Sequence, residues 1–263
     1  MKPIENFLNG ITMYRLMLYY LIFLWIEVFA LTFFNVLPFS FFQFLISTIA
    51  ILSTCYLTNK LFSHIFKAPT NLESVYISAL ILVFLILPAK TIPELAFIIV
   101  AGFFAMASKY ILAISKRHIF NPAAVAVFIT ALFSLGYASW WIGNLWTAIP
   151  ILIGGLLIIK KIKRLSMVSG FLTTFLISTL FFSFINGSDL PKTIYRVLID
   201  SPIFFFSFVM LVEPLTSPAT KRMKIIYGLL VGILAGSQFS IGPVYSTYET
   251  ALIVGNVFAF IFS

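Results

Sequence analysis

Apolar segments about 20 residues long recur along the whole chain, and they limit its fold more than any other feature. A membrane-spanning helix needs about 20 mostly apolar residues, and shorter ones are tolerated where neighbours shield them. The chain is 61% hydrophobic and 10% charged, whereas a soluble domain carries about 25% charged residues. The sequence therefore predicts an all-α polytopic membrane protein with about ten transmembrane helices, at roughly 13–36, 39–59, 72–88, 93–113, 120–137, 142–160, 167–186, 201–213, 223–239 and 245–262.

The distribution of basic residues predicts the orientation of these spans. Cytoplasmic loops of membrane proteins are enriched in Lys and Arg. Ten crossings that start inside leave only Lys90, Lys192 and Arg196, of 17 basic residues, on the outer side. We therefore expect an integral inner (cytoplasmic) membrane protein with both termini cytoplasmic. The net charge of +9 then reflects topology in the lipid bilayer, and no nucleic acid partner is predicted.

Two short spans resemble each other and indicate an internal repeat. Glu73-Ser74 leads into a run that ends at Pro88, and Asp200-Ser201 leads into a run that ends at Pro214. Each run is the third of five spans, and an odd number of spans places the two halves in opposite orientations. We expect one integral membrane domain over 1–263, built from inverted halves at about 13–137 and 142–262. Coincidence is the alternative, since acidic caps and terminal prolines are common at span ends.

The first candidate site is the loop between the fourth and fifth spans. Asn121 and Pro122 are typical of the start of a helix, where Asn caps free N–H groups and Pro loses no hydrogen bond. A helix N-terminus attracts anions, and Lys109 lies near the end of the preceding span. Further positive charge beside it comes from Lys116, Arg117 and His118. The stretch is either an anion or ring-oxygen cradle or only a capped helix next to cytoplasmic basic residues.

The second candidate site is the Pro-rich loop after the eighth span. It contains an acid, three hydroxyl residues and two cations: Glu213, Thr216, Ser217, Thr220, Lys221 and Arg222. Such a loop can donate and accept hydrogen bonds to a flat heteroaromatic ligand, or its hydroxyls can simply cap the ninth helix. We expect both loops to lie at the inner membrane face and form one site, with Glu213 holding Lys109 or Arg117.

Glu27 lies inside the first span. Carboxyl groups in the membrane are costly and usually mark proton or cation sites, so Glu27 is a candidate for an ion pathway; a protonated residue at a helix contact is the alternative.

Three Trp residues near the outer loop are typical of an interfacial belt: Trp140, Trp141 and Trp146. The single Cys55 excludes a disulfide framework, and no catalytic group or metal site is predicted.

These two loops resemble a known family. Lys109-Tyr110, followed by His118-Ile-Phe-Asn-Pro-Ala-Ala124, is similar to the loop before the fifth helix of the NqrB/RnfD family. The stretches 204–220 and 225–234 resemble that family's later loop and helix, with Glu213 in place of Asp. These proteins are membrane subunits of sodium-pumping NADH:quinone reductase and of the Rnf complex. The resemblance implies a urea-transporter-like fold, flavin, and electron transfer coupled to ion movement.

One departure concerns the flavin. Family members that bind FMN covalently attach it to Thr in an S/T-x-A-T element, in an insertion after the fifth helix. Here residues 136–144 join the spans directly and lack that element. Ser217-Pro-Ala-Thr220 has the right letters but aligns with the later loop instead. The chain therefore resembles a minimal member without covalent FMN.

The favoured hypothesis is a membrane electron-transport subunit, part of a redox-driven ion-translocating oxidoreductase, that holds a non-covalent flavin (FMN or riboflavin). Asn121, Ser217 and Thr220 would bond the flavin, and Lys109, Arg117 and His118 would stabilise its reduced form. It would need other membrane and soluble redox subunits as partners. The rival hypothesis is a channel or transporter for a small solute on the same scaffold, and a third is a structural subunit that only docks partners.

Overall fold

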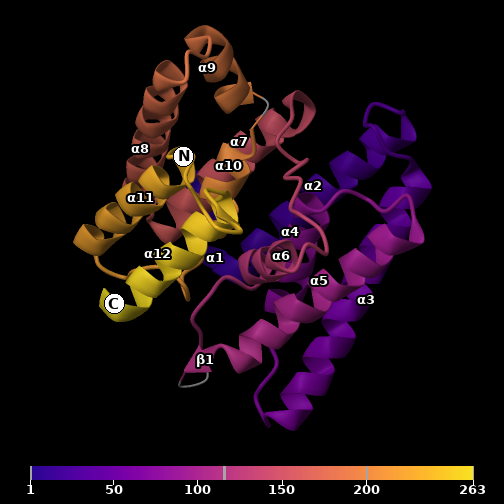
Figure 1. The fold of residues 1–263 in the computed structure, drawn as a ribbon. Coiled ribbons are helices and arrows are strands. Elements are labelled where there is room, and N and C mark those ends of the chain that lie inside the picture. Colours follow the sequence, from indigo (N-terminus) through magenta and orange to yellow (C-terminus); the bar gives the residue numbers. More distant parts are fainter. Residues whose placement is uncertain (1, 115–116, 200, 263) are drawn as a thin grey trace.

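The fold comes from a computed structural model that describes residues 2–114, 117–199 and 201–262. Lys116 of the first candidate loop and Asp200 of the predicted repeat lie outside the described residues. In Figure 1 the first half of the chain, in indigo and magenta, lies on one side of the molecule, and most of the second half, in orange and yellow, lies on the other. The protein is all-α apart from two short hairpins.

The first half begins with the short helix α1 (Lys2–Gly10), followed by the long helices α2 (Met13–Phe33) and α3 (Phe41–Ile65). The next elements are α4 (Leu72–Leu85), α5 (Ile92–Ile111), the hairpin β1 (Ala113–Ile114) and β2 (Arg117–His118), and α6 (Pro122–Leu132). The second half contains α7 (Leu145–Ile162), α8 (Leu165–Ile185), α9 (Leu190–Ile199), α10 (Ile203–Phe205), the π-helix η1 (Phe206–Met210), α11 (Lys221–Gly236), the hairpin β3 (Ser240–Ile241) and β4 (Val244–Tyr245), and α12 (Tyr248–Phe262).

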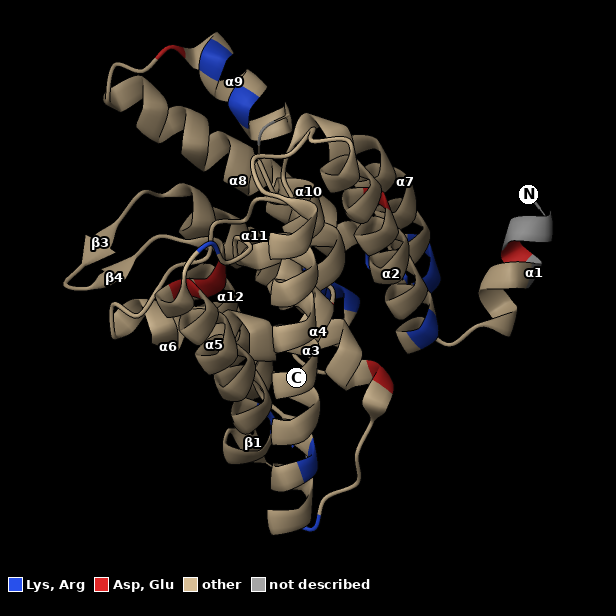
Figure 2. Ribbon diagram, turned by 90° about the vertical axis from the view of Figure 1, so that its right-hand side faces the viewer, with Lys and Arg blue, Asp and Glu red and all other residues tan. Residues whose placement is uncertain are grey.

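Every predicted span contains a helix, but the helices differ in length. Among the described residues, α2, α3, α5, α7 and α8 are long and apolar enough to cross a membrane. A sixth candidate is α9 together with α10 and η1, bent by 52° at the break. The helices α4, α6 and α12 are apolar but shorter. Figure 2 shows few charged residues along the helices. The protein is an integral membrane protein, while the count of ten crossings stays a prediction.

The loop after α6 donates hydrogen bonds to the free carbonyl groups at the end of the short helix α4. The backbone N–H groups of Ser139 and Trp140 donate to the Leu85 oxygen at 2.8 and 3.0 Å. The indole of Trp141 donates to the carbonyls of Val83 and Ile86. Helix ends inside a membrane need such partners because no water can replace them. This loop therefore holds the broken end of α4 within the protein.

The prediction of a Trp belt is wrong for two of its three members. Trp140 is 8% exposed and Trp141 is half-buried, because their indole N–H groups serve buried acceptors. Trp146 is 58% exposed, as a belt residue would be. Aromatic residues next to a membrane surface can equally bond the helix ends beneath them.

Helices α8 and α11 pack with their backbones in close contact. Gly228, Gly232 and Gly236 recur every fourth residue on the face of α11 that meets α8. A Cβ added at Gly232 would lie 2.5 Å from the Phe171 carbonyl oxygen. Small residues at this spacing let two membrane helices approach closely. The pair fixes the start of α11, and with it the loop that carries Glu213.

The two halves share an order of elements that bears on the predicted repeat. In the first half, a short helix (α4) is followed by a long one (α5), a two-stranded hairpin and the short α6. In the second half, the short α10–η1 segment is followed by α11, another hairpin and α12. This parallel favours the inverted repeat, which remains a proposal here.

The sequence did not predict α1 and α9. Both are short helices of mixed polarity, and α9 carries Lys192 and Arg196 (Figure 2). They were missed because a search for long apolar runs does not detect amphipathic helices.

Candidate functional site

The two predicted loops meet at Glu213, which follows η1. The His118 ring Nε2 lies 3.1 Å from Glu213 Oε1, and the side-chain amide of Asn121 donates to Oε2 at 2.9 Å. The hydroxyl of Thr216 also donates to Oε2, at 3.3 Å. The Glu213 side chain is 16% exposed. A carboxylate that is removed from water needs such donors, so this acid is the centre of a built polar cluster.

The partner of Glu213 is His118, not Lys109 or Arg117 as expected from the sequence. Ala113 pairs with His118 and Ile114 with Arg117 in the β1–β2 hairpin. Successive side chains on a strand point to opposite faces. His118 is therefore directed toward Glu213, while Arg117 is exposed.

Opposing effects act on the pKa of Glu213. Burial alone would raise the pKa of this carboxyl, because desolvation penalises its charged form. The hydrogen bond and charge of His118, together with the charge of Lys109, outweigh burial and hold the pKa below its ordinary value. These contacts thus favour the ionised form of the carboxylate, and the charge of Lys109 helps to balance it.

Asn121 serves two roles at the start of α6. Its side-chain oxygen accepts from the Ala124 N–H at 3.1 Å, which confirms the predicted N-cap. Its amide bonds Glu213, and its own backbone N–H donates to Asn256 on α12 at 2.9 Å. Asn256 in turn donates to the Thr216 carbonyl and the Tyr227 hydroxyl. Helices α6, α11 and α12 and the Glu213 loop are thereby joined.

Arg164, in the turn between α7 and α8, fixes the far side of the loop. Its guanidinium donates to the Ser217 hydroxyl and to the Pro218 carbonyl at 3.3 Å, and it is only 5% exposed. The Ser217 hydroxyl donates in turn to the Glu213 carbonyl. Burial lowers the pKa of Arg164, with a smaller opposing effect from Tyr227. Arg164 therefore positions the Glu213 loop from a second helix pair.

Lys109 faces a different part of the site. Its ammonium group donates to the carbonyl and hydroxyl of Ser74, in the first turn of α4, at 2.9 and 3.0 Å. Lys109 and His118 line a cavity of about 340 Å³. Aromatic rings and amides complete its wall: Tyr14, Phe66, Tyr110, Asn59 and Asn71. This cavity combines a cation, an imidazole and flat apolar rings.

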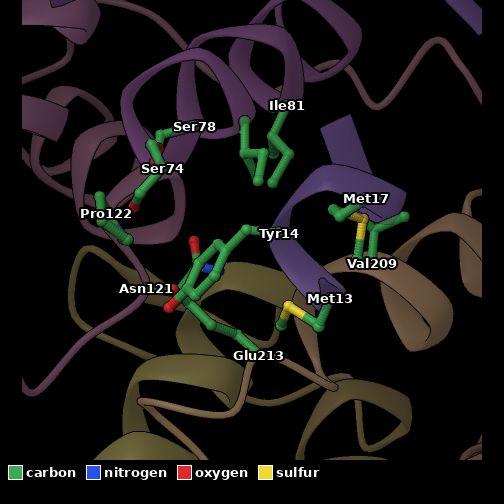
Figure 3. A pocket seen from close by; sticks show the side chains of 11 residues that line it. Met13, Tyr14, Met17, Ser74, Ser78, Ile81, Asn121, Pro122, Val209 and Glu213 are labelled. Carbon is green, nitrogen blue, oxygen red and sulfur yellow. The ribbon is translucent and has the colours of Figure 1, made fainter. Parts of the chain in front are cut away.

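A second, narrow cavity of about 20 Å³ adjoins the first, and both are lined by Tyr14 and Ser74. In Figure 3, Tyr14 and Asn121 lie close together with Glu213 beside them, and Met17 and Val209 lie together on another side. The volume of this narrow cavity is close to that of one water molecule. Asn121 and Glu213 therefore face a water-sized space, whereas Lys109 and His118 face a ligand-sized one.

The remaining predicted residues lie elsewhere. Thr220 is exposed and its hydroxyl accepts from the Met223 N–H at 3.4 Å, so it caps α11. Glu27 lies in α2, and its Oε2 is buried without a hydrogen-bond partner among the described residues. No group of three or more His, Cys, Asp or Glu that could hold a metal ion occurs within the described parts of the chain.

Sequence reasoning missed four residues of the cluster: Ser74, Arg164, Tyr227 and Asn256. Asn256 could have been found, since a lone amide in an apolar helix is rare and usually bonded. In the sequence, Arg164 is only one of the many basic residues that indicate the cytoplasmic side. Ser74 and Tyr227 carry no local signal, because only the tertiary fold brings them to the site.

Comparison with known proteins agrees with the resemblance inferred from the motifs. The family model described as "NQR2, RnfD, RnfE family" matches residues 135–262, a range that includes the Glu213 loop, α11 and α12. The loop that carries Lys109, His118 and Asn121 precedes the matched range. A search of curated proteins finds no match.

Proposed function

We propose that this chain is a membrane-embedded electron-transport subunit holding a non-covalent flavin. The premise is that the chain belongs, through residues 135–262, to the NQR2, RnfD, RnfE family. Members of this family are subunits of ion-translocating redox complexes. The observation that carries the proposal for this chain is the cavity of about 340 Å³ that Lys109 and His118 share with aromatic rings.

The residues of this cavity fit a flavin (FMN or riboflavin). A flat heteroaromatic ring needs apolar faces and a few donors at its edge. Phe66 and Tyr110 lie 5.9 Å apart between ring centroids, and the Tyr110 hydroxyl is fixed by Asn59 at 2.8 Å. Lys109 and His118 supply positive charge. When bound, a flavin would supply electron transfer in one- or two-electron steps.

The chain's own residues then have separate roles. Lys109 would hold the electronegative edge of the ring, because its ammonium is fixed by Ser74 and cannot turn away freely. Glu213 would keep His118 oriented toward the cavity through their 3.1 Å contact. Asn121, Thr216 and Ser217 act through Glu213 and its loop rather than on the ligand. Arg117 and Thr220 are exposed, so we give them no contact with the ring.

Ion movement is the second part of the proposal. Glu27 lies within α2 with a buried oxygen that lacks a hydrogen-bond partner among the described residues. A carboxyl group in that state is stable in a membrane only when protonated or when it binds a cation. We assign Glu27 to an ion pathway that is coupled to electron transfer.

The wider arrangement follows from the same hypothesis. The chain would cross the inner membrane ten times as two inverted, urea-transporter-like halves, with both termini in the cytoplasm. It would receive and pass on electrons through other membrane and soluble redox subunits. Its flavin would be non-covalent, since residues 136–144 leave no room for an attachment insertion.

The visible spectrum of the purified full-length protein tests this function. A flavin absorption band that survives gel filtration, and that Lys109→Gln removes, would support the proposal. A folded but colourless preparation after expression with riboflavin in excess would contradict it and favour the rival, a channel or transporter for a small solute. The narrow cavity where α2, α4, α6 and η1 meet is the feature that favours this rival.

A further inference from the structure

Helices α2 and α7 lie side by side and run antiparallel. The Tyr20 hydroxyl of α2 donates to the Ile151 carbonyl of α7 at 3.2 Å. Near the end of α7, the Lys161 ammonium donates to the carbonyl of Leu8, which precedes the start of α2. The C-terminal end of α7 therefore lies beside the N-terminal end of α2. Figure 2 shows the two helices next to each other, with basic residues at the end of α2 that leads to α1.

A groove of about 370 Å³ runs between these two helices. Its floor is the Tyr20 ring, which lies so close to α7 that a Cβ added at Gly154 would be 2.2 Å from it. Its walls carry exposed apolar side chains, among them Phe23 and Ile153, that face the bilayer. The volume is within the range of small-ligand sites, about 300–1,000 Å³. The groove can therefore hold a flexible apolar chain that lies along the two helices.

Each wall of the groove continues into a basic residue at the same end. On α2, Arg15 precedes Tyr19 by four residues, and Tyr19 precedes Phe23 by four. On α7, Lys160 follows Leu157 by three residues. Residues three or four apart on a helix share a face, so both cations lie at one mouth of the groove. By the predicted topology this mouth is cytoplasmic, where anionic lipids give the membrane surface its negative potential.

The two cations remain available to an anion from the membrane. The Arg15 Nε donates to Glu73 at 2.9 Å, and both terminal nitrogen atoms of this guanidinium lack a hydrogen-bond partner among the described residues. The Lys160 ammonium lies 3.5 Å from Glu5, with both side chains about half exposed. Exposed ion pairs contribute little to stability, so a phosphate group can share or replace these carboxylates. A guanidinium binds phosphate through two parallel hydrogen bonds.

We propose that the groove between α2 and α7 is a binding site for an anionic phospholipid. One acyl chain lies in the groove, and the phosphate lies at its mouth between Arg15 and Lys160. The combination selects this class of ligand, because a neutral lipid does not use the cations and a free phosphate does not use the groove. The groove shares no lining residue with the cavities of the candidate functional site, so the proposal requires no flavin.

Thermal unfolding of the delipidated full-length protein in neutral detergent tests the site, with helical circular dichroism as the readout. Dioleoyl phosphatidylglycerol, dioleoyl phosphatidylcholine or glycerol phosphate is added in increasing amounts. A ligand that binds the folded state raises Tm in a saturable way. We expect the phosphatidylglycerol midpoint to be at least about tenfold lower than that of phosphatidylcholine, and no rise with glycerol phosphate. The double variant Arg15→Gln, Lys160→Gln should remove the preference, and Ile153→Trp should block the groove to both lipids.

Two matched controls should respond like the wild type. Lys60→Gln removes an exposed cation at the end of α3, and Ile177→Trp enlarges an equally exposed apolar residue on α8. If Ile153→Trp does not fold, the double charge variant decides alone. Equal midpoints for the two lipids in the wild type, or a preference that the double variant retains, would overturn the site and mean that only unselective bilayer lipid covers it. A colourless preparation counts against the flavin and has no bearing on this comparison.

Discussion

Asn256 and Asn121 are joined by a hydrogen bond of 2.9 Å from the Asn121 backbone N–H to the Asn256 side-chain oxygen. Both residues are at most 2% exposed. The bond satisfies one of the free N–H groups at the start of α6, which a membrane-embedded helix cannot leave to water. It also places α12 against the loop that carries Glu213, since the Asn256 amide donates to Thr216.

The first prediction concerns this bond. Asn256→Ala leaves the buried N–H of Asn121 and the Thr216 carbonyl without partners. An unsatisfied buried group costs about 1–3 kcal/mol. The free energy of unfolding in detergent should fall by at least that amount. Asn186→Ala is the control, because Asn186 bonds Gln238 on the surface, and it should change stability by less than about 0.5 kcal/mol. Equal effects of the two variants would show that Asn256 is not a structural tie.

The second prediction concerns the contact of α8 with α11. Gly232→Ala places a Cβ 2.5 Å from the Phe171 carbonyl oxygen, so the two helices must separate. Overpacking of this kind costs about 1–3 kcal/mol. Gly10→Ala adds a Cβ to α1 with nothing within 4 Å and should be neutral or stabilising. The Tm values of the two variants give the comparison, and an unchanged Tm for Gly232→Ala would show that the helices can shift without cost.

Much of the fold follows from local signals in the sequence, and the site follows only in part. Apolar length placed a helix in each predicted span, and the Asn-Pro pair fixed the start of α6 because both residues act locally. Glu213 pairs with His118 because of the register of the β1–β2 hairpin. No pattern in residues 109–124 indicates that register. The roles of Trp140 and Trp141 depended on where α4 ends in space.

The third prediction concerns topology. The loop at Trp140 should be external and the turn at Arg164 cytoplasmic, because one span, α7, separates them. Reporter fusions at residues 140 and 164 should therefore report opposite sides. Two fusions that report the same side would rule out the crossing of α7 and, with it, the ten-span arrangement.

The fourth prediction concerns pH. The pKa of Glu213 is lower in the folded protein than its ordinary value of 4.5, so the unfolded state binds a proton first as the pH falls. The stability that Glu213 contributes is fully present above pH 4.5 and is lost as the pH falls through the folded pKa. The wild type should lose more stability than Glu213→Gln between neutral pH and acid. His118, Lys109 and Tyr14 face this carboxyl and stay constant in the comparison. Parallel pH curves for the two proteins would contradict the assignment.

The last prediction separates residues that hold flavin from residues that only cap helices. Lys109→Gln keeps a donor for Ser74 but removes the charge at the cavity of about 340 Å³. Loss of a charged hydrogen bond costs about 1.5–3 kcal/mol, so flavin affinity should fall about tenfold or more. Lys90→Gln, at an exposed position, should keep the wild-type affinity.

Thr220→Val tests the capping role directly. Its hydroxyl accepts from Met223 N–H at the start of α11, so the substitution should lower stability by about 1 kcal/mol and leave flavin binding unchanged. Denaturing gels after co-expression with a flavin transferase should show no flavin fluorescence in either protein. A fluorescent band that Thr220→Val removes would mean that this residue carries the flavin covalently, and the bound ring would then lie beside α11 rather than beside Lys109.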